Sequence, residues 1–217
     1  MSTSRETDVA GAIRDALLRG DYVPRQRLVE ADICERFGVS RSGVRSAFQQ
    51  LAAEGLVEIQ HNRGTRVREV TFAEAVEMTE ARMVLEGLIA ARAAERISRT
   101  QAEELRETGT DMAKAVSDGE LMTYKDLSVR LHRSVRDIAG HEAANQILER
   151  LRAQVVRHHS MLSLVPGRAH ASLPQHRRII EAIVAGDPAR AEATMRDHVS
   201  GVVDALRALA VAQGRAG

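Results

Sequence analysis

The sequence is poor in residues on which several functional classes depend. It has one cysteine, Cys34, in 217 residues, which excludes an internal disulfide and a cysteine-based zinc framework within one chain. Tryptophan is absent and aromatic residues make up only 2% of the chain. Proteins that bind single-stranded nucleic acid take much of their affinity from bases stacked on aromatic side chains. The composition therefore disfavours that class and leaves duplex DNA as the more natural nucleic-acid target.

Long apolar runs are also missing. No run approaches the ~20 residues that a membrane-spanning helix needs. The N-terminal segment MSTSRETDVAG lacks the hydrophobic centre of a secretory signal. We therefore expect a soluble, cytoplasmic protein, and a chain of this length is expected to form two domains.

Charge is informative only locally, because the formal net charge of the chain is +1. Between Arg41 and Arg68, five arginines stand against two glutamates, Glu54 and Glu58. Nucleic-acid-binding proteins concentrate basic residues on one face. This segment is therefore the candidate DNA-binding surface.

The first 70 residues show the pattern of three helices followed by a hairpin. Apolar residues recur at helical spacing from Val9 until Gly20-Asp21, a second helix is expected over about 29–37, and Ser40 is a suitable N-cap for a third that ends near Gly55. The segments LVEIQ and TRVRE then alternate as a strand pair around the turn 61–64. This order predicts a winged helix-turn-helix with a two-stranded wing over residues 1–70.

From residue 71 to 217 the composition changes, and helical periodicity is nearly continuous. Pro166-Gly167 and Gly186-Asp187-Pro188 mark two of the breaks. We expect an all-α bundle of six or seven helices. The expected helices are about 73–97, 101–118, 120–139, 143–163, 172–185 and 188–212. The fold class is therefore mostly α.

The start of the third helix and the tip of the wing carry the candidate DNA contacts. In a helix-turn-helix, the first residues of the second motif helix reach base edges, and an arginine there can bridge guanine O6 and N7. Similar arginines occur on ordinary solvated faces, but a second basic element at the wing tip favours DNA. The candidates are Arg41, Ser42, Arg45, Gln49, Arg63, Gly64, Thr65 and Arg66.

Three histidines have spacings that suit a shared site. His176 and His198 are equidistant from Asp187 in the predicted turn, so in a helical hairpin they lie at the same height, about 15 Å along each helix. His132 lies on the inward face of an earlier helix. Three converging imidazoles suit Zn²⁺ or a similar divalent ion. The alternative is that they are polar residues with their hydrogen bonds satisfied inside a helical core.

The N-terminal residues resemble a known family. LLRGDYVPRQRLVEADICERFGVSRSGVRSAFQQLAAEGLVEIQHNRGTRV is similar to the DNA-binding domain of GntR-type regulators, through its G-x-Y-x-P opening, its FGVSR turn, the EGLV before the wing and the RGT at the tip. The resemblance makes Arg41, Arg45, Gly64 and Thr65 the strongest candidates for DNA contact. A contact arginine that some members carry in the second helix falls here at Ala31.

The C-terminal residues resemble the FCD effector domain of the FadR branch of that family, through EARMVLEG at 80–87, LHRSVRDIAG at 131–140 and the segment 175–199. The resemblance implies one divalent metal ion, zinc or similar, held by an Asp and three His, and a carboxylate effector. His132, His176 and His198 match the three histidines, and Ser128 stands at the Asp position, so weaker metal binding is expected. Arg82 and Ser128 are the candidate effector ligands, with Arg82 alternatively an ion-pair partner of Glu86 at i+4.

The remaining histidines are given no metal role, and His158, His159 and His170 are expected near a break and exposed. The function expected is a homodimeric transcription regulator that binds a palindromic operator and responds to a small carboxylate, with repression as the family default. The alternatives are a metal-sensing regulator and a metal-dependent hydrolase built on the helical bundle. No carboxylate is placed by spacing as a general base beside the histidines, which disfavours the hydrolase.

Overall fold

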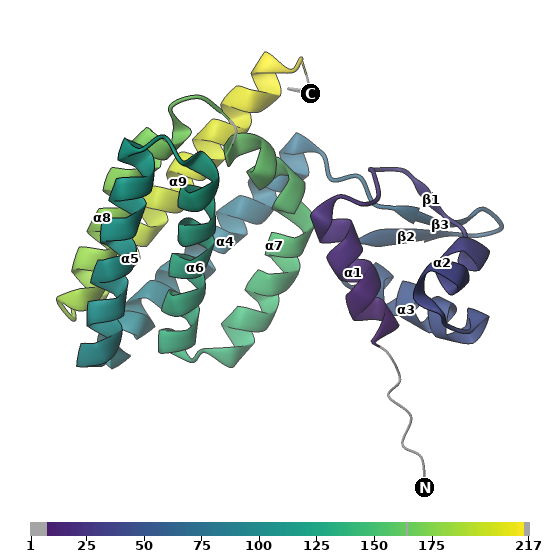
Figure 1. The fold of residues 1–217 in the computed structure, drawn as a ribbon, viewed down its shortest axis with the longest axis horizontal. Helices are drawn as coiled ribbons and strands as arrows, with labels where there is room; N and C mark the ends of the chain where they lie inside the picture. Colours follow the sequence, from purple (N-terminus) through teal and green to yellow (C-terminus); the bar gives the residue numbers. More distant parts are fainter. Residues whose placement is uncertain (1–7, 164, 215–217) are drawn as a thin grey trace, which may run out of the picture. The chain divides into compact units, whose positions relative to one another are not determined.

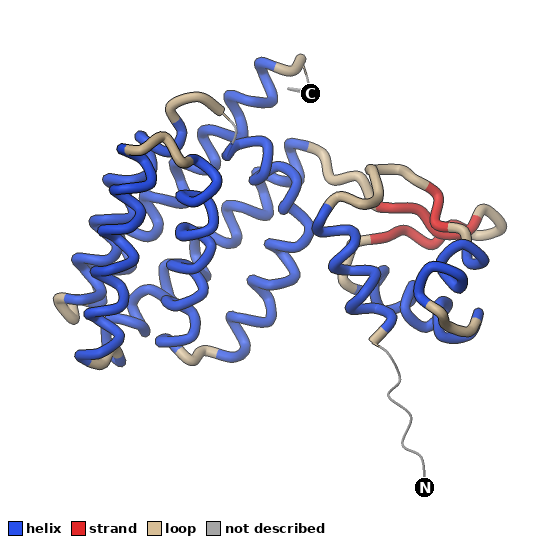
Figure 2. Tube along the Cα trace, in the orientation of Figure 1, coloured by secondary structure: helices blue, strands red, loops and turns tan. Residues whose placement is uncertain are grey.

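The computed structural model describes residues 8–163 and 165–214, and the chain divides into two compact units, Met1–Thr71 and Phe72–Gly217 (Figure 1). Helices dominate both units, and within these described residues all strands lie in the first unit (Figure 2). The prediction of a mostly α chain with an N-terminal winged helix-turn-helix is confirmed. Among the described residues, no helix has the length and apolarity needed to cross a membrane.

The helices of the first unit are α1 (Val9–Arg19), α2 (Glu30–Phe37) and α3 (Arg41–Ala53). Local signals set their ends. Gly38 ends α2 in the left-handed conformation, at φ 67°, and the Ser40 side chain accepts a hydrogen bond from the Gly43 amide at 3.2 Å to begin α3. These two residues form the turn of the helix-turn-helix, as the sequence predicts.

The wing is a three-stranded antiparallel sheet in the order β1-β3-β2. Its strands are β1 (Arg27–Leu28), β2 (Val57–Gln60) and β3 (Gly64–Val67). The expected two-stranded wing is therefore incomplete, because β1 also pairs with β3, with Leu28 opposite Thr65. Two residues are too short to show an alternating pattern, so β1 gives no sequence signal of its own.

The apolar stripes of the three helices form most of the core of the first unit, and the strands add buried residues such as Val57. Ile13, Ile33, Val44, Phe48 and Leu51 are all almost fully buried. A bidentate pair also links α1 to the end of α3, with Arg14 Nε and Nη2 donating to Glu54 at 2.7 and 2.6 Å. The buried stripe of α3 fixes the rotation of the helix, and its other face is left exposed.

The second unit contains six helices within the described residues, which agrees with the lower of the two expected numbers. They are α4 (Phe72–Arg96), α5 (Arg99–Ser117), α6 (Leu121–Ala139), α7 (Glu142–Ser163), α8 (Arg168–Val184) and α9 (Pro188–Ala212). Helix α8 begins four residues before its expected start at 172 and contains Pro174 in its interior. The helix begins directly after Gly167, which occupies the N-cap position in the left-handed conformation at φ 78°.

Helix α4 is the central element of this unit and packs against α6, α7, α8 and α9. Helices α8 and α9 form an antiparallel hairpin around Gly186-Asp187-Pro188, and Asp187 caps α9 by accepting from the Arg190 amide at 3.0 Å. Ile89, Leu131, Ile179 and Met195 are among the buried residues that join these helices. Helices α5 and α7 complete the core, for example with Met112 and Leu148.

Candidate nucleic-acid interface and candidate metal centre

The start of α3 presents a polar surface. Arg41, Ser42, Arg45 and Gln49 are all exposed, while Val44 and Phe48 between them are buried. The four candidate DNA contacts of α3 are therefore open to a ligand of the first unit.

Arg45 is held by a carboxylate from the neighbouring helix. Its Nε lies 2.9 and 3.1 Å from the two carboxylate oxygens of Glu30, in the first turn of α2. The Arg45 side chain nevertheless remains 69% exposed. Within the described part of the chain, its Nη1 and Nη2 groups donate no hydrogen bond, so both remain available to a ligand.

The wing places its candidate residues on different sides. Arg63, Gly64 and Arg66 are exposed, whereas Thr65, on the central strand β3 that pairs with both β1 and β2, is only 6% exposed. Gly64 has φ 82°, a conformation that favours glycine. The tip of the wing is therefore basic and has no side chain at Gly64. The buried Thr65 side chain is not available for contact at the tip.

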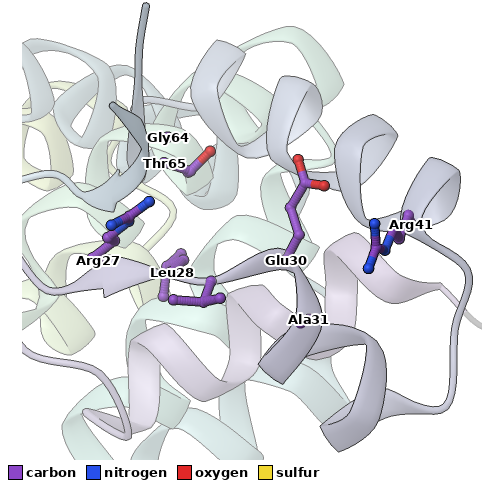
Figure 3. Close-up of a pocket in the computed structure, with 8 residues that line it drawn as sticks. Arg27, Leu28, Glu30, Ala31, Arg41, Gly64 and Thr65 are labelled. Atoms are coloured by element: carbon purple, nitrogen blue, oxygen red, sulfur yellow. The ribbon is translucent and has the colours of Figure 1, made fainter. Parts of the chain in front are cut away.

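A cleft lies between the start of α2, the start of α3 and the wing (Figure 3). Its volume is about 300 Å³. Arg27 borders the cleft from β1 and Arg41 from α3, and Glu30 stands between them in this view. Arg27 was not predicted from the sequence, because its place beside Gly64 depends on the pairing of β1 with β3. The remaining lining residues are Leu28, Val29, Ala31, Gly64 and Thr65.

The arginines of the first unit differ in whether a carboxylate neutralises them. Five have an ion pair: Arg14 with Glu54, Arg19 and Arg36 with Asp21, Arg25 with Glu69, and Arg45 with Glu30. By contrast, Arg27, Arg41, Arg63 and Arg66 have no carboxylate within ion-pair distance among the residues that the structure describes. These four lie at the cleft and on the wing, so this part of the unit keeps an uncompensated positive charge.

In the second unit, His132 from α6, His176 from α8 and His198 from α9 converge in the interior. One ring nitrogen from each lies within 4.8 Å of the others, and the ring centroids of His176 and His198 are 4.4 Å apart. All three side chains are buried. The hairpin geometry inferred from the sequence is therefore correct. Ser128, one turn before His132, lies with its Oγ 3.3 Å from His176 Nε2, at the edge of the same centre.

Each ring is held from outside by a polar partner on its Nδ1 atom. Gln175 Oε1 lies 3.1 Å from His198 Nδ1, and the Tyr124 hydroxyl lies 2.9 Å from His176 Nδ1. Glu86 Oε2 lies 3.2 Å from His132 Nδ1, an ion-pair distance at angles outside those of a hydrogen bond. Metal-bound histidines characteristically bind an outer partner through their second nitrogen. This pattern leaves Nε2 of all three rings toward the shared centre.

Burial keeps the three imidazoles neutral. It lowers the pKa of His198 to about 3, and it lowers the pKa of His132 and, more strongly, that of His176. A neutral imidazole has a free nitrogen lone pair for a metal ion. Three neutral imidazoles with oriented outer partners match the donor set of a zinc site that keeps one position open, so the residues present fit a divalent metal.

A buried charged network adjoins His132. Arg82 donates through Nε and Nη2 to Glu86 Oε1 at 3.1 and 2.8 Å, and its Nη1 lies 2.8 Å from His159 Nε2. The ion pair considered for Arg82 is therefore present. Burial raises the pKa of Glu86, but the nearby charges of Arg82 and Arg152 and the contact with His132 outweigh burial and hold this pKa well below its usual value. Glu86 thus remains a carboxylate and orients His132.

The expected exposure of His158 is wrong. Its side chain is 7% exposed, and its ring packs edge-on against Phe72 with centroids 4.9 Å apart. Helix α7 ends at Ser163, close to the expected position, and His158 lies on the face of this helix that packs inside the unit. The expected exposure of His159 is also wrong, because its ring is half-buried against Arg82, whereas His170 is exposed, as expected. Glu86, Tyr124 and Gln175 had no sequence signal as histidine partners.

Sequence comparisons assign both parts of the chain. Residues 5–67 match the family described as "Bacterial regulatory proteins, gntR family", and residues 77–201 match the FCD domain. The candidate DNA contacts of α3 lie inside the first match, and the three histidines lie inside the second.

Curated relatives cover nearly the whole chain. One is the "Probable D-xylose utilization operon transcriptional repressor" of Paenarthrobacter nicotinovorans, 32% identical over 92% of this chain and 89% of its own length. Another is the "HTH-type transcriptional repressor RspR" of Escherichia coli (strain K12), 30% identical over 88% of this chain and 86% of its own length. LutR of Bacillus subtilis (strain 168), described as a transcriptional regulator, is 28% identical over 86% and 94%.

Solved structures share the fold. The Escherichia coli protein McbR/YncC aligns with a TM-score of 0.76 at 18% identity, covering 96% of this chain and 99% of the other. The Streptococcus agalactiae GntR protein aligns with a TM-score of 0.51 at 24% identity, covering 90% and 97%. At these identities the alignments show the fold alone.

Proposed function

Because the chain belongs to the gntR family of bacterial regulatory proteins and carries an FCD domain, we propose that a small organic anion bound in the helical unit controls how a homodimer holds its operator. The chain is a DNA-binding transcription regulator, as its relatives are, so the hydrolase alternative is set aside. The metal-sensing alternative is not favoured, since none of the relatives named above has a metal in its description. We propose repression, as two of these relatives are named repressors.

Operator binding uses α3 and the wing of the first unit, and the observation that supports this most strongly is the distribution of ion pairs. Arg27, Arg41, Arg63 and Arg66 have no carboxylate neighbour among the described residues, although five other arginines of the unit do. When such an unpaired cation binds a phosphate, counterions are released from the DNA, and this release favours binding. Arg45 supplies base readout through its two open amino groups, and Ser42 and Gln49 extend the contact surface along α3. The buried Thr65 contributes to the packing of the wing and not to its contact surface.

One such surface spans a single half-site, which supplies few contacts. A homodimer on a palindromic operator doubles them and raises discrimination accordingly. Ligand binding in the helical unit then changes the spacing or mobility of the two DNA-binding units. Because the two equilibria are linked, an anion that weakens operator binding must itself bind more weakly when the operator is present.

The effector site is the centre formed by His132, His176 and His198. These residues would hold a divalent ion through their Nε2 atoms, and such an ion would supply a Lewis-acidic position for a carboxylate oxygen of the effector. Ser128 borders this position and can donate a hydrogen bond to the bound anion. Arg82 is committed to Glu86 and His159, so its contribution is to fix Glu86 and with it the His132 ring.

The test uses a duplex selected by the protein from a random-sequence library. We expect the selected sequences to contain an inverted repeat and two chains to bind each duplex. Zinc-loaded protein should lose affinity for this duplex when certain small carboxylates, screened individually at fixed ionic strength, are added. The His198→Ala variant should bind the duplex and ignore the same carboxylates. A response that is equal in both proteins would exclude the three-histidine centre as the effector site.

A further inference from the structure

Glu30 occupies an unusual place in the candidate DNA interface. It is an acidic side chain at a surface that otherwise carries unpaired arginines, and it stands in the cleft between Arg27 and Arg41 (Figure 3). A carboxylate here opposes the attraction between the cleft and the phosphates of DNA. Its presence therefore needs a reason other than general affinity for nucleic acid.

Its contact with Arg45 supplies that reason. Both carboxylate oxygens of Glu30 lie at hydrogen-bond distance from the same atom, Arg45 Nε, at 2.9 and 3.1 Å. Guanine is read by the end of the guanidinium group, and Nη1 and Nη2 remain free of hydrogen bonds within the described residues. Glu30 thus binds the guanidinium group at Nε and leaves Nη1 and Nη2 available for a guanine.

We propose that Glu30 is a positioning residue for base recognition: it fixes Arg45 in the orientation that reads a guanine and, by its charge, weakens binding to DNA that offers no guanine there. This inference rests on the proposed role of Arg45 in operator binding. An exposed arginine samples many rotamers, and ordering it on binding has a cost. An arginine that is already ordered avoids most of this cost.

Two effects of opposite sign follow from this arrangement. Loss of the Glu30 charge releases Arg45 to move, which lowers affinity for the selected duplex by about two- to tenfold, from the ordering cost of one such side chain. The same loss removes the only carboxylate among the residues that line the cleft, which raises affinity for unrelated DNA. A residue that only stabilised the fold would lower both affinities together.

The experiment compares Glu30→Gln with Glu35→Gln in the full-length protein. Glu35 lies on the same helix, is exposed, and has no ion pair among the described residues, so the two substitutions remove the same charge. Fluorescence anisotropy at one fixed salt concentration measures affinity for the duplex selected by the wild-type protein and for a shuffled duplex. Both substitutions are repeated in an Arg45→Ala background, and thermal unfolding checks that all variants fold.

We expect Glu30→Gln to lower the ratio of the two affinities, Glu35→Gln to leave it unchanged, and Glu30→Gln to have no effect on it once Arg45 is absent. An unchanged ratio, an equal loss on both duplexes, or the same fall in the Arg45→Ala background would each overturn the inference. If the wild-type protein selects no sequence at all, the proposed function fails first and this inference fails with it.

Discussion

Replacement of His198 by alanine should abolish the stabilisation of the protein by zinc. The side chain is buried on α9 and contributes one of three ring nitrogens that lie within 4.8 Å of one another. With alanine at this position, two histidines and the Ser128 hydroxyl remain. A neutral hydroxyl is a far weaker ligand than imidazole for zinc, so tight binding should be lost.

The size of the effect follows from linkage. A ligand that binds only the folded state, at a free concentration 100 times its dissociation constant, stabilises that state by about 2.7 kcal/mol. For a domain of this size, each kcal/mol raises the midpoint of thermal unfolding by about 2–4 °C. Zinc should therefore raise the midpoint of the wild-type helical unit by about 5–10 °C and that of His198→Ala by close to zero.

Differential scanning calorimetry of metal-stripped protein, with and without added zinc, measures this shift. His170→Ala is the matched control, because His170 also lies in the hairpin segment but is exposed and outside the centre. It should keep the full shift. Equal zinc stabilisation of His198→Ala and wild-type protein would refute the assignment of the three histidines, as would its loss in His170→Ala.

Three further predictions address the surroundings of the two sites. Gln175→Ala removes the oxygen that orients His198, and it should weaken zinc binding in a competition titration by about 10–100-fold while leaving the three imidazoles in place. Glu86→Gln leaves the buried Arg82 without its carboxylate and should reduce the free energy of unfolding in urea by about 3–5 kcal/mol. Glu80, which is partly exposed and paired with Arg207, provides the comparison, and Glu80→Gln should cost less than about 1 kcal/mol. We expect Arg63 at the wing tip, which is exposed and has no ion pair within the described residues, to bind a phosphate and not a base. Arg63→Ala should therefore weaken binding to selected and shuffled duplexes equally and reduce the slope of log affinity against log salt by about 1. A change in the ratio of the two affinities would contradict a phosphate contact.

The elements that the sequence predicted well are those that local signals define. The turn before α3 follows from Gly38 and Ser40, and the convergence of His176 and His198 follows from their equal distance from the Gly-Asp-Pro turn. In each case the information lies within one helix or one hairpin. Periodicity and capping are sufficient to locate residues at that range.

The features that the sequence did not predict depend on contacts between distant segments. Strand β1 is visible only through its pairing with β3, and that pairing brings Arg27 to the cleft. Glu86 and Tyr124 are separated from the histidines they contact by 46 and 52 positions, and Glu30 from Arg45 by 15. The packing of helices against one another determines such partners. Because contacts of this kind occur at no fixed sequence separation, a single sequence does not reveal them.

Sequencing of the genomic fragments that the purified protein retains, at a salt concentration near 0.15 M, tests the central claim most directly. The account predicts that wild-type protein retains a small set of fragments sharing one inverted repeat, that retention falls steeply as salt is raised, and that Arg45→Ala loses the preference for this set. Retention of all fragments alike, or a preference that survives intact in Arg45→Ala, would contradict it.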